Sequence, residues 1–156
     1  MVEFTLVGIP VVFALISIFE LSLGMWQYHT LAHAIREGTR FAIVHGKGCD
    51  SANCRVTVGD IAQHIRTVGL VQNDLNLEFE SEHGGTVSCR LDACLAKTSR
   101  PGDIWPPAGS DSPGMEVTIR GVYSVHTILM MFNMAGSTGG AFTFRLPAAS
   151  TDIIQF

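Results

Sequence analysis

The N-terminal quarter of the chain is apolar and nearly free of charge. No charged residue lies between Phe4 and Phe19, and after Glu20 the sequence LSLGMWQYHTLAHAI continues without a formal charge as far as Arg36. A membrane-spanning helix needs about 20 predominantly apolar residues. The segment 4–28 exceeds this length and contains one acid. The pattern therefore predicts a transmembrane helix.

A signal peptide or a buried core helix would fit this stretch less well. A secretory signal peptide begins with a basic region, but no Lys or Arg precedes the apolar run here. A buried core helix would require the small remainder of the chain to wrap the whole of 4–28. A carboxylate at the centre of a bilayer costs a few kcal/mol, so we expect Glu20 to have a partner or a purpose.

The helix is expected to continue beyond the membrane. Small and apolar residues recur at steps of three and four, the period of one helix face; they are Leu31, Ala34, Ile35, Gly38, Phe41 and Ala42. A helix from about Glu3 to about His45 would measure about 65 Å at 1.5 Å per residue. Pro10 removes one main-chain hydrogen bond and should kink it. We therefore divide the chain into a membrane and assembly segment, residues 1–28, and a head, residues 29–156, that includes the second half of this helix.

The head is expected to contain a second, short helix. Thr57 is followed three residues later by Asp60, a spacing that allows the two side chains to hydrogen-bond free N–H groups at a helix start. Apolar residues then follow at helical spacing over 58–69.

The rest of the head predicts strands. Three segments alternate between apolar and polar side chains, as strands with one buried face do; they are residues 75–79, 115–123 and 142–146. Gly84-Gly85 predicts a hairpin turn into a further strand over 86–90. Residues 95–114 are rich in Pro, Gly and Ser and predict one long loop. The apolar run at 127–132 is expected in the core, and a contact surface is the alternative if it is exposed.

These elements predict an α+β fold. It consists of a long N-terminal transmembrane and amphipathic helix packed on a small antiparallel sheet of three to four strands, with one short helix. The sheet has to bury one face, and the second half of the long helix is the available apolar partner.

Composition and charge support this division. Charged residues make up only 15% of the chain, the mean hydropathy is +0.30 and the net charge is −4. The segment 1–35 holds two charges, Glu3 and Glu20, whereas the segment 36–156 holds all ten Lys and Arg and twelve of the fourteen acids. Such a chain is too apolar to be disordered. With a pI near 5.8 and no basic block, it is also unsuited to binding nucleic acid.

The four cysteines form two pairs with the same spacing. Cys49 and Cys54 are five positions apart, as are Cys89 and Cys94. Four cysteines behind a membrane segment suggest an oxidising compartment, and we favour two local disulfides. The alternatives are cross-linked connectivities, free thiols, and a zinc site built from all four thiolates, although zinc knuckles usually have a narrower spacing.

No enzyme motif is evident in the sequence. It contains no G-x-S-x-G elbow, P-loop or G-x-G-x-x-G. His29 and His33 have the spacing of two metal ligands on a helix, but an interfacial position beside Trp26 and Tyr28 explains them better. We expect a non-enzymatic protein with no cofactor and no bound metal.

The segment 2–42 also carries a dense set of motifs. They are VEFTLVGIP at 2–10, IFE at 18–20, Gly24 and AIREGTRFA at 34–42. This pattern resembles the TadE-like family of minor pilins, or pseudopilins, of tight-adherence (Tad/Flp) type IV pilus systems. The likeness is dense over this segment and looser downstream, at the short helix, the strand 115–123 and the closing FRLPAAST.

The resemblance implies a type IV pilin-like fold and a structural function in assembly or priming of such a pilus. It implies other pilins and minor pilins, the inner-membrane assembly machinery and membrane lipid as partners, with no nucleic acid. It also implies a single-pass protein of the bacterial inner membrane with a periplasmic head, or a subunit of a surface pilus. One alternative is a membrane-anchored extracytoplasmic binding or adhesion module that does not polymerise. A second is an anchored metalloenzyme built on the cysteines with His29 and His33.

The resemblance assigns assembly roles to Glu3, Phe4, Pro10 and Glu20. Glu3 is the candidate to pair with the free amino group of a neighbouring subunit; a helix N-terminal acid favoured by the helix dipole is the alternative. In the family this acid is fifth after a basic leader that a prepilin peptidase removes, whereas Glu3 is third in this sequence. The peptidase is therefore a partner if an upstream leader exists. The family motif residues are Ala34, Arg36, Glu37, Gly38, Arg40, Phe41 and Ala42.

Overall fold

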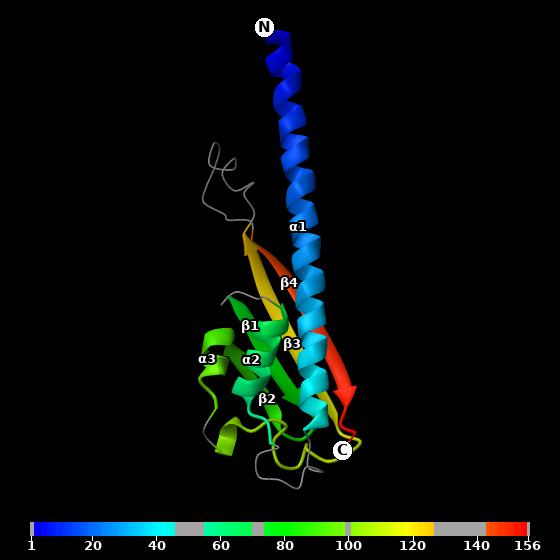
Figure 1. Cartoon of the computed structure of the whole chain (residues 1–156), viewed down its shortest axis with the longest axis vertical. Coiled ribbons are helices and arrows are strands. Elements are labelled where there is room, and N and C mark those ends of the chain that lie inside the picture. Colours follow the sequence, from blue (N-terminus) through cyan, green and yellow to red (C-terminus); the bar gives the residue numbers. More distant parts are fainter. Residues whose placement is uncertain (1, 46–54, 70–73, 99–100, 127–142, 156) are drawn as a thin grey trace.

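The computed structural model is a rod with a small head around one half of it (Figure 1). It describes residues 2–45, 55–69, 74–98, 101–126 and 143–155. The elements in chain order are α1 (Val2–Val44), α2 (Val58–Gly69), β1 (Leu75–Ser81), β2 (Gly85–Arg90), α3 (Leu91–Leu95), the 3-10 turn η1 (Pro101–Asp103), β3 (Glu116–His126) and β4 (Thr143–Ile153). The predicted α+β fold is confirmed.

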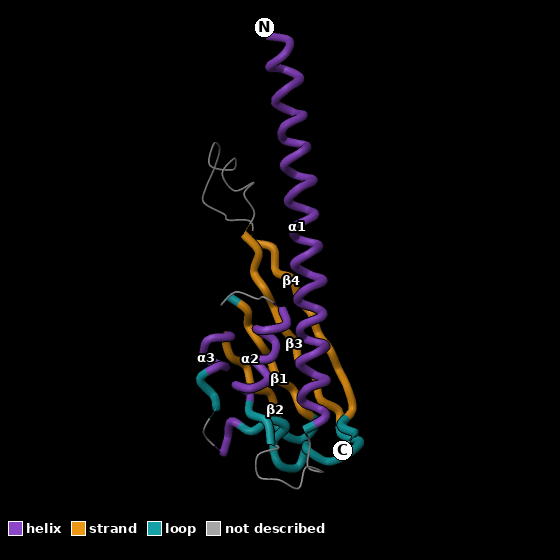
Figure 2. Tube along the Cα trace, in the orientation of Figure 1, coloured by secondary structure: helices purple, strands orange, loops and turns teal. Residues whose placement is uncertain are grey.

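Helix α1 is one continuous element of 43 residues. Its N-terminal half extends beyond the head, and its C-terminal half lies along the sheet (Figure 2). The predicted long helix is therefore confirmed within one or two residues at each end. Pro10 lies inside the helix without interrupting it, so the expected kink does not amount to a break.

The sheet is antiparallel and has the strand order β2-β1-β3-β4. The hairpin β1–β2 pairs Leu77 with Cys89, and β3 pairs Tyr123 with Leu146 of β4. Strand β4 runs much further than the alternation at 142–146 predicted, because β3 pairs with it along its whole length. Pro147 lies in an edge strand, which is where a sheet tolerates proline, because an edge N–H can face away from the sheet.

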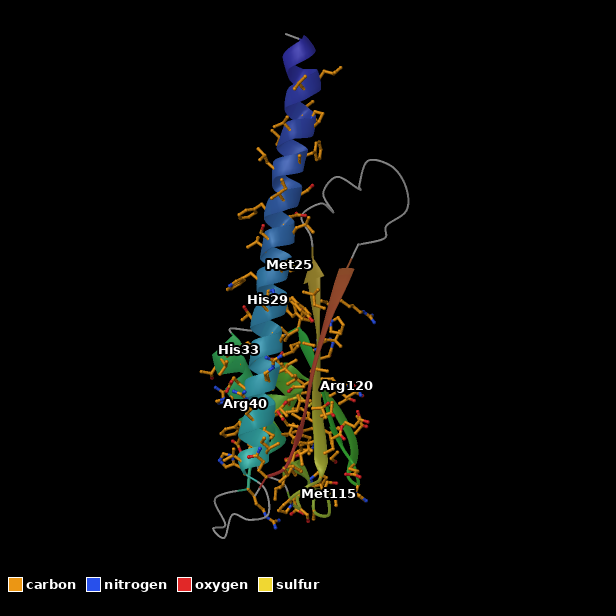
Figure 3. All side chains as sticks on the ribbon, turned by 90° about the vertical axis from the view of Figure 1, so that its right-hand side faces the viewer. Met25, His29, His33, Arg40, Met115 and Arg120 are labelled. Atoms are coloured by element: carbon orange, nitrogen blue, oxygen red, sulfur yellow. A yellow bond between two sulfur atoms is a disulfide. The ribbon has the colours of Figure 1, made fainter. Side chains whose placement is uncertain are left out.

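One face of the sheet forms the core with the helices. Leu75, Leu77 and Phe79 of β1 are buried, while the alternating polar residues are exposed or half-buried, as the alternation predicts; they are Asn76, Glu78 and Glu80. The opposite face is polar and includes an ion pair between Arg120 and Glu80 at 3.0 Å. Figure 3 shows α1 on one side and the strands on the other.

Two glycines allow the helices and the sheet to approach closely. A Cβ on Gly38 of α1 would lie 2.5 Å from Cγ1 of Ile65 in α2, and a Cβ on Gly121 of β3 would collide with Ile35 of α1. Neither position therefore has room for a Cβ. Gly38 allows α1 to pack closely on α2, and Gly121 allows β3 to pack closely on α1.

The predicted start of α2 is confirmed. The carboxylate Oδ2 of Asp60 accepts hydrogen bonds from the main-chain N–H of Thr57 at 3.0 Å and from its hydroxyl at 2.7 Å. In return the main-chain N–H of Asp60 donates to Thr57 Oγ1 at 3.2 Å. This reciprocal pair satisfies N–H groups that a helix start leaves free.

The segment 95–114 differs from its prediction as one long loop. Helix α3 ends at Leu95 just as the segment begins, and η1 lies within it, so the head has more helix than the one short helix expected. Trp105 is only 2% exposed and contacts the ring of Phe79 edge to face, with 5.3 Å between ring centroids. The main-chain N–H of Trp105 also donates to the carbonyl of Val56 at 3.0 Å. Pro and Gly content indicates irregular backbone but not which side chain it buries. The apolar run at 127–132 lies outside the described residues.

Candidate functional site

The N-terminal half of α1 is both exposed and apolar. Leu6 is 73% exposed, Phe19 63% and Leu21 71%. Within Leu6–Val44 the most apolar window of the helix has a mean hydropathy of 2.3, and none of that window is buried. Removing one such side chain from water contributes about 1.5–3 kcal/mol. By length and composition this helix can cross a membrane.

The predicted assembly residues all lie on this part of α1. Glu3 and Phe4 are helical, but their side chains lie outside the described residues. Pro10 is exposed, and Glu20 is half-buried. Glu20 stands on the same face of α1 as Gly24 and Leu31, at steps of four and seven residues. That face is the one that further along the helix packs on the head.

The family motif at 34–42 forms the contact between α1 and the head. Ala34 and Ala42 are fully buried, and Gly38 faces Ile65 of α2. The small residues of the motif are thus required by close packing. Arg36 and Arg40 point away from the core and are exposed. Arg40 forms an ion pair with Glu37 at 3.2 Å.

Phe41 completes the junction by stacking on one histidine and contacting a second. Its ring lies parallel to that of His64 in α2, with centroids 4.7 Å apart, and contacts His45 at 4.6 Å. His45 Nδ1 donates to the carbonyl of Phe41 at 2.7 Å, because a carbonyl oxygen can only accept. These rings line an open groove of about 510 Å³ together with Arg55 and Gln63. Sequence reasoning missed this cluster, because isolated histidines 19 positions apart carry no periodic signal.

One of the two predicted disulfides is confirmed. Cys89 at the end of β2 is bonded to Cys94 in α3, with Cα atoms 5.5 Å apart. This bond ties the edge strand to the helix that follows it. Cys49 and Cys54 lie outside the described residues, so their predicted pairing stays a prediction.

In the described structure, no third ligand lies beside the two histidines that were candidate metal ligands. His29 and His33 are both exposed on α1. The part of the chain that the structure describes contains no group of three or more His, Cys, Asp or Glu placed to hold a metal ion.

Together these features describe a protein with a long apolar helix and a small head. A small α+β head packs around the second half of a long helix whose first half is apolar enough to span a membrane. Residues 1–40 match the family model of TadE-like protein. The match confirms the resemblance seen in the N-terminal motifs, and it covers that part of the chain alone. No curated protein and no solved structure matches the chain.

Proposed function

We propose that this chain is a minor pilin that is anchored in the bacterial inner membrane and takes part in assembly or priming of a tight-adherence type IV pilus. The observation that carries the proposal is the exposed apolar half of α1, which is continuous with the half that packs on the head. The TadE-like match over residues 1–40 supports it, because that match covers this segment. The partners proposed are other pilins and the inner-membrane assembly machinery, with the head on the periplasmic side.

The proposed mechanism is helix packing without catalysis. The apolar half of α1 first lies in lipid and then packs among the corresponding helices of other subunits, so that it never has to meet water. The exposed large side chains at every angle around α1 suit both surroundings, since neither lipid nor a bundle of similar helices requires a polar face. The head then remains outside this bundle and contacts neighbouring heads.

In this mechanism Glu3 sets the axial position of the subunit. Its carboxylate pairs with the free amino group of a neighbouring subunit, away from water. A buried ion pair adds little net stability, but removing one partner leaves the other charge unpaired and costs about 3–5 kcal/mol. Glu3 is therefore proposed to determine register rather than general affinity.

Fractionation of sheared pili tests the proposal. The wild-type chain is expected in both the membrane and the sheared pilus fraction, whereas Glu3→Ala should remain in the membrane and disappear from the pili. Glu116→Ala is a matched control, because it removes an exposed acid of the head. Recovery of Glu3→Ala in sheared pili at the wild-type level would contradict the role of Glu3.

A second candidate function is a membrane-anchored binding or adhesion module that does not polymerise. The open groove beside Phe41 and His64 favours it, since a volume of about 510 Å³ is within the range of small-ligand sites. The same fractionation separates the two. If the wild-type chain is found only in the membrane fraction and normally formed sheared pili do not contain it, the result would support the binding module and contradict the minor pilin.

A further inference from the structure

The head covers one side of α1 and leaves the other side bare. Along the bare side, His29, His33, Arg36 and Arg40 follow one another at steps of four, three and four residues, and all four are exposed. Figure 3 shows three of them in succession along α1, below Met25. At 100° per residue they lie on the face opposite the buried Leu31 and Gly38. We call these four residues the basic face of α1.

The basic face begins where the apolar half of α1 ends. Trp26 and Tyr28 are exposed immediately before it, and such residues are enriched at membrane–water interfaces. His29 to Arg36 rise about 12 Å beyond Tyr28, whereas a headgroup layer is roughly 5–8 Å thick. Side chains of a helix lean toward its N-terminus, which is the membrane end here. The imidazoles and the Arg36 guanidinium are thus within reach of the headgroup layer.

The charge of this face is positive and partly uncompensated. Glu37 is the only acid between Leu21 and Arg40, and it is paired with Arg40. Glu20 stands on the opposite side of the helix. Arg36 has no ion-pair partner among the described residues. It also lies nearer the membrane end of α1 than Arg40 does.

We infer that the basic face of α1 binds the phosphate groups of anionic phospholipids at the membrane surface. The inference rests on the proposed membrane anchoring. Arg36 is the main phosphate contact, because guanidinium groups pair well with phosphate oxygens, and the ring N–H groups of His29 and His33 donate below it. Because the sheet lies on the other side of α1, these contacts tilt the helix toward its bare side and lift the sheet away from the lipid.

Lipid selectivity of the reconstituted full chain tests the inference. The chain is placed in vesicles with spin-labelled phosphatidylglycerol or phosphatidylcholine, and the relative association of the two lipids is measured. Wild type should prefer phosphatidylglycerol, and Arg36→Gln should reduce that preference about fivefold, the effect of one cation near an anionic surface. Arg36→Lys should retain most of it. Arg120→Gln is the matched control, because it removes an exposed arginine of the polar sheet face.

Each outcome bears on one of the two proposals. Flotation with pure phosphatidylcholine vesicles reports anchoring alone, and a chain that fails to float would overturn the anchoring and this inference with it. A chain that floats but shows no preference for phosphatidylglycerol, or one that keeps its preference in Arg36→Gln, would overturn the inference only. Loss of pilus assembly in Arg36→Gln with unchanged lipid preference would also overturn it, since the face would then bind an acidic protein surface.

Discussion

The two halves of α1 belong to one helix but have opposite surroundings. Ile18 in the first half is 62% exposed, whereas Ile35 in the second half is fully buried. Both are aliphatic residues on a continuous helix, so neither residue type nor secondary structure explains the difference. What differs is the tertiary partner: Ile35 lies against Gly121 of β3, where an added Cβ would collide with it, whereas Ile18 lies on the exposed half of the helix.

Hydrophobicity and close packing are therefore separate properties of this helix. Small residues on one face allow a protein partner to approach closely, as Gly38 does toward Ile65. Exposed large residues with no such partner, as in the first half of α1, instead suit lipid or a bundle of similar helices. Four pairs of variants test this distinction. Three compare the two halves of α1, and the fourth tests the helix that packs against its second half.

The largest effect is expected from truncating the same residue type in each half. Ile35→Ala should destabilise the head by about 2–5 kcal/mol, because it leaves a cavity between α1 and the sheet. Ile18→Ala should leave head unfolding unchanged. Urea unfolding of the full chain in micelles, followed by the fluorescence of the buried Trp105 in a Trp26→Phe background, measures both. Equal effects of the two variants would show that the halves are not distinct.

A charge placed in the first half comes next. Leu15→Arg should disfavour membrane insertion by about 3 kcal/mol, because Leu15 lies near the middle of the apolar stretch. The fraction of chain that resists alkaline extraction from membranes should fall. His33→Arg adds a charge beyond that stretch and should have no such effect. Undiminished retention of Leu15→Arg would argue against the membrane span.

Two glycines provide a smaller contrast. Gly38→Leu should destabilise the head by about 1–3 kcal/mol through overpacking against Ile65. Gly24→Leu, where an added Cβ meets nothing within 4 Å, should leave head unfolding unchanged. The two melting temperatures, measured by circular dichroism, would be indistinguishable if α1 and α2 were not closely packed.

The smallest effect concerns the helix that packs against the second half of α1. Thr57→Ala removes the hydroxyl that caps α2 and should cost about 1 kcal/mol. Thr67→Ala is the control, since its hydroxyl bonds only to the carbonyl of Gln63 within the same helix. A loss of stability in the control as large as in Thr57→Ala, measured by the same urea unfolding, would contradict the assigned cap.

Local patterns predicted much of the fold and part of the candidate site. Alternation in β1, the Thr57–Asp60 cap and the spacing of Cys89 and Cys94 each depend on residues close together in the chain, so the sequence shows them directly. The burial of Trp105 and the stacking of Phe41 on His64 could not be predicted in this way. Each joins segments distant in the chain, and neither has a repeating pattern that indicates its partner.

By itself the sequence determined where the chain can meet lipid, because a nearly uncharged stretch such as 4–28 has that capacity in any arrangement of the rest. It also determined which face of α1 is apolar beyond that stretch, since helical periodicity is a local property. The tertiary structure alone decided what covers that face and what stays bare. Both follow from how the head packs on α1: β3 lies against Ile35, α2 lies against Gly38, and Arg36 stays outside. These contacts join segments that are distant in the chain, and no single segment encodes them.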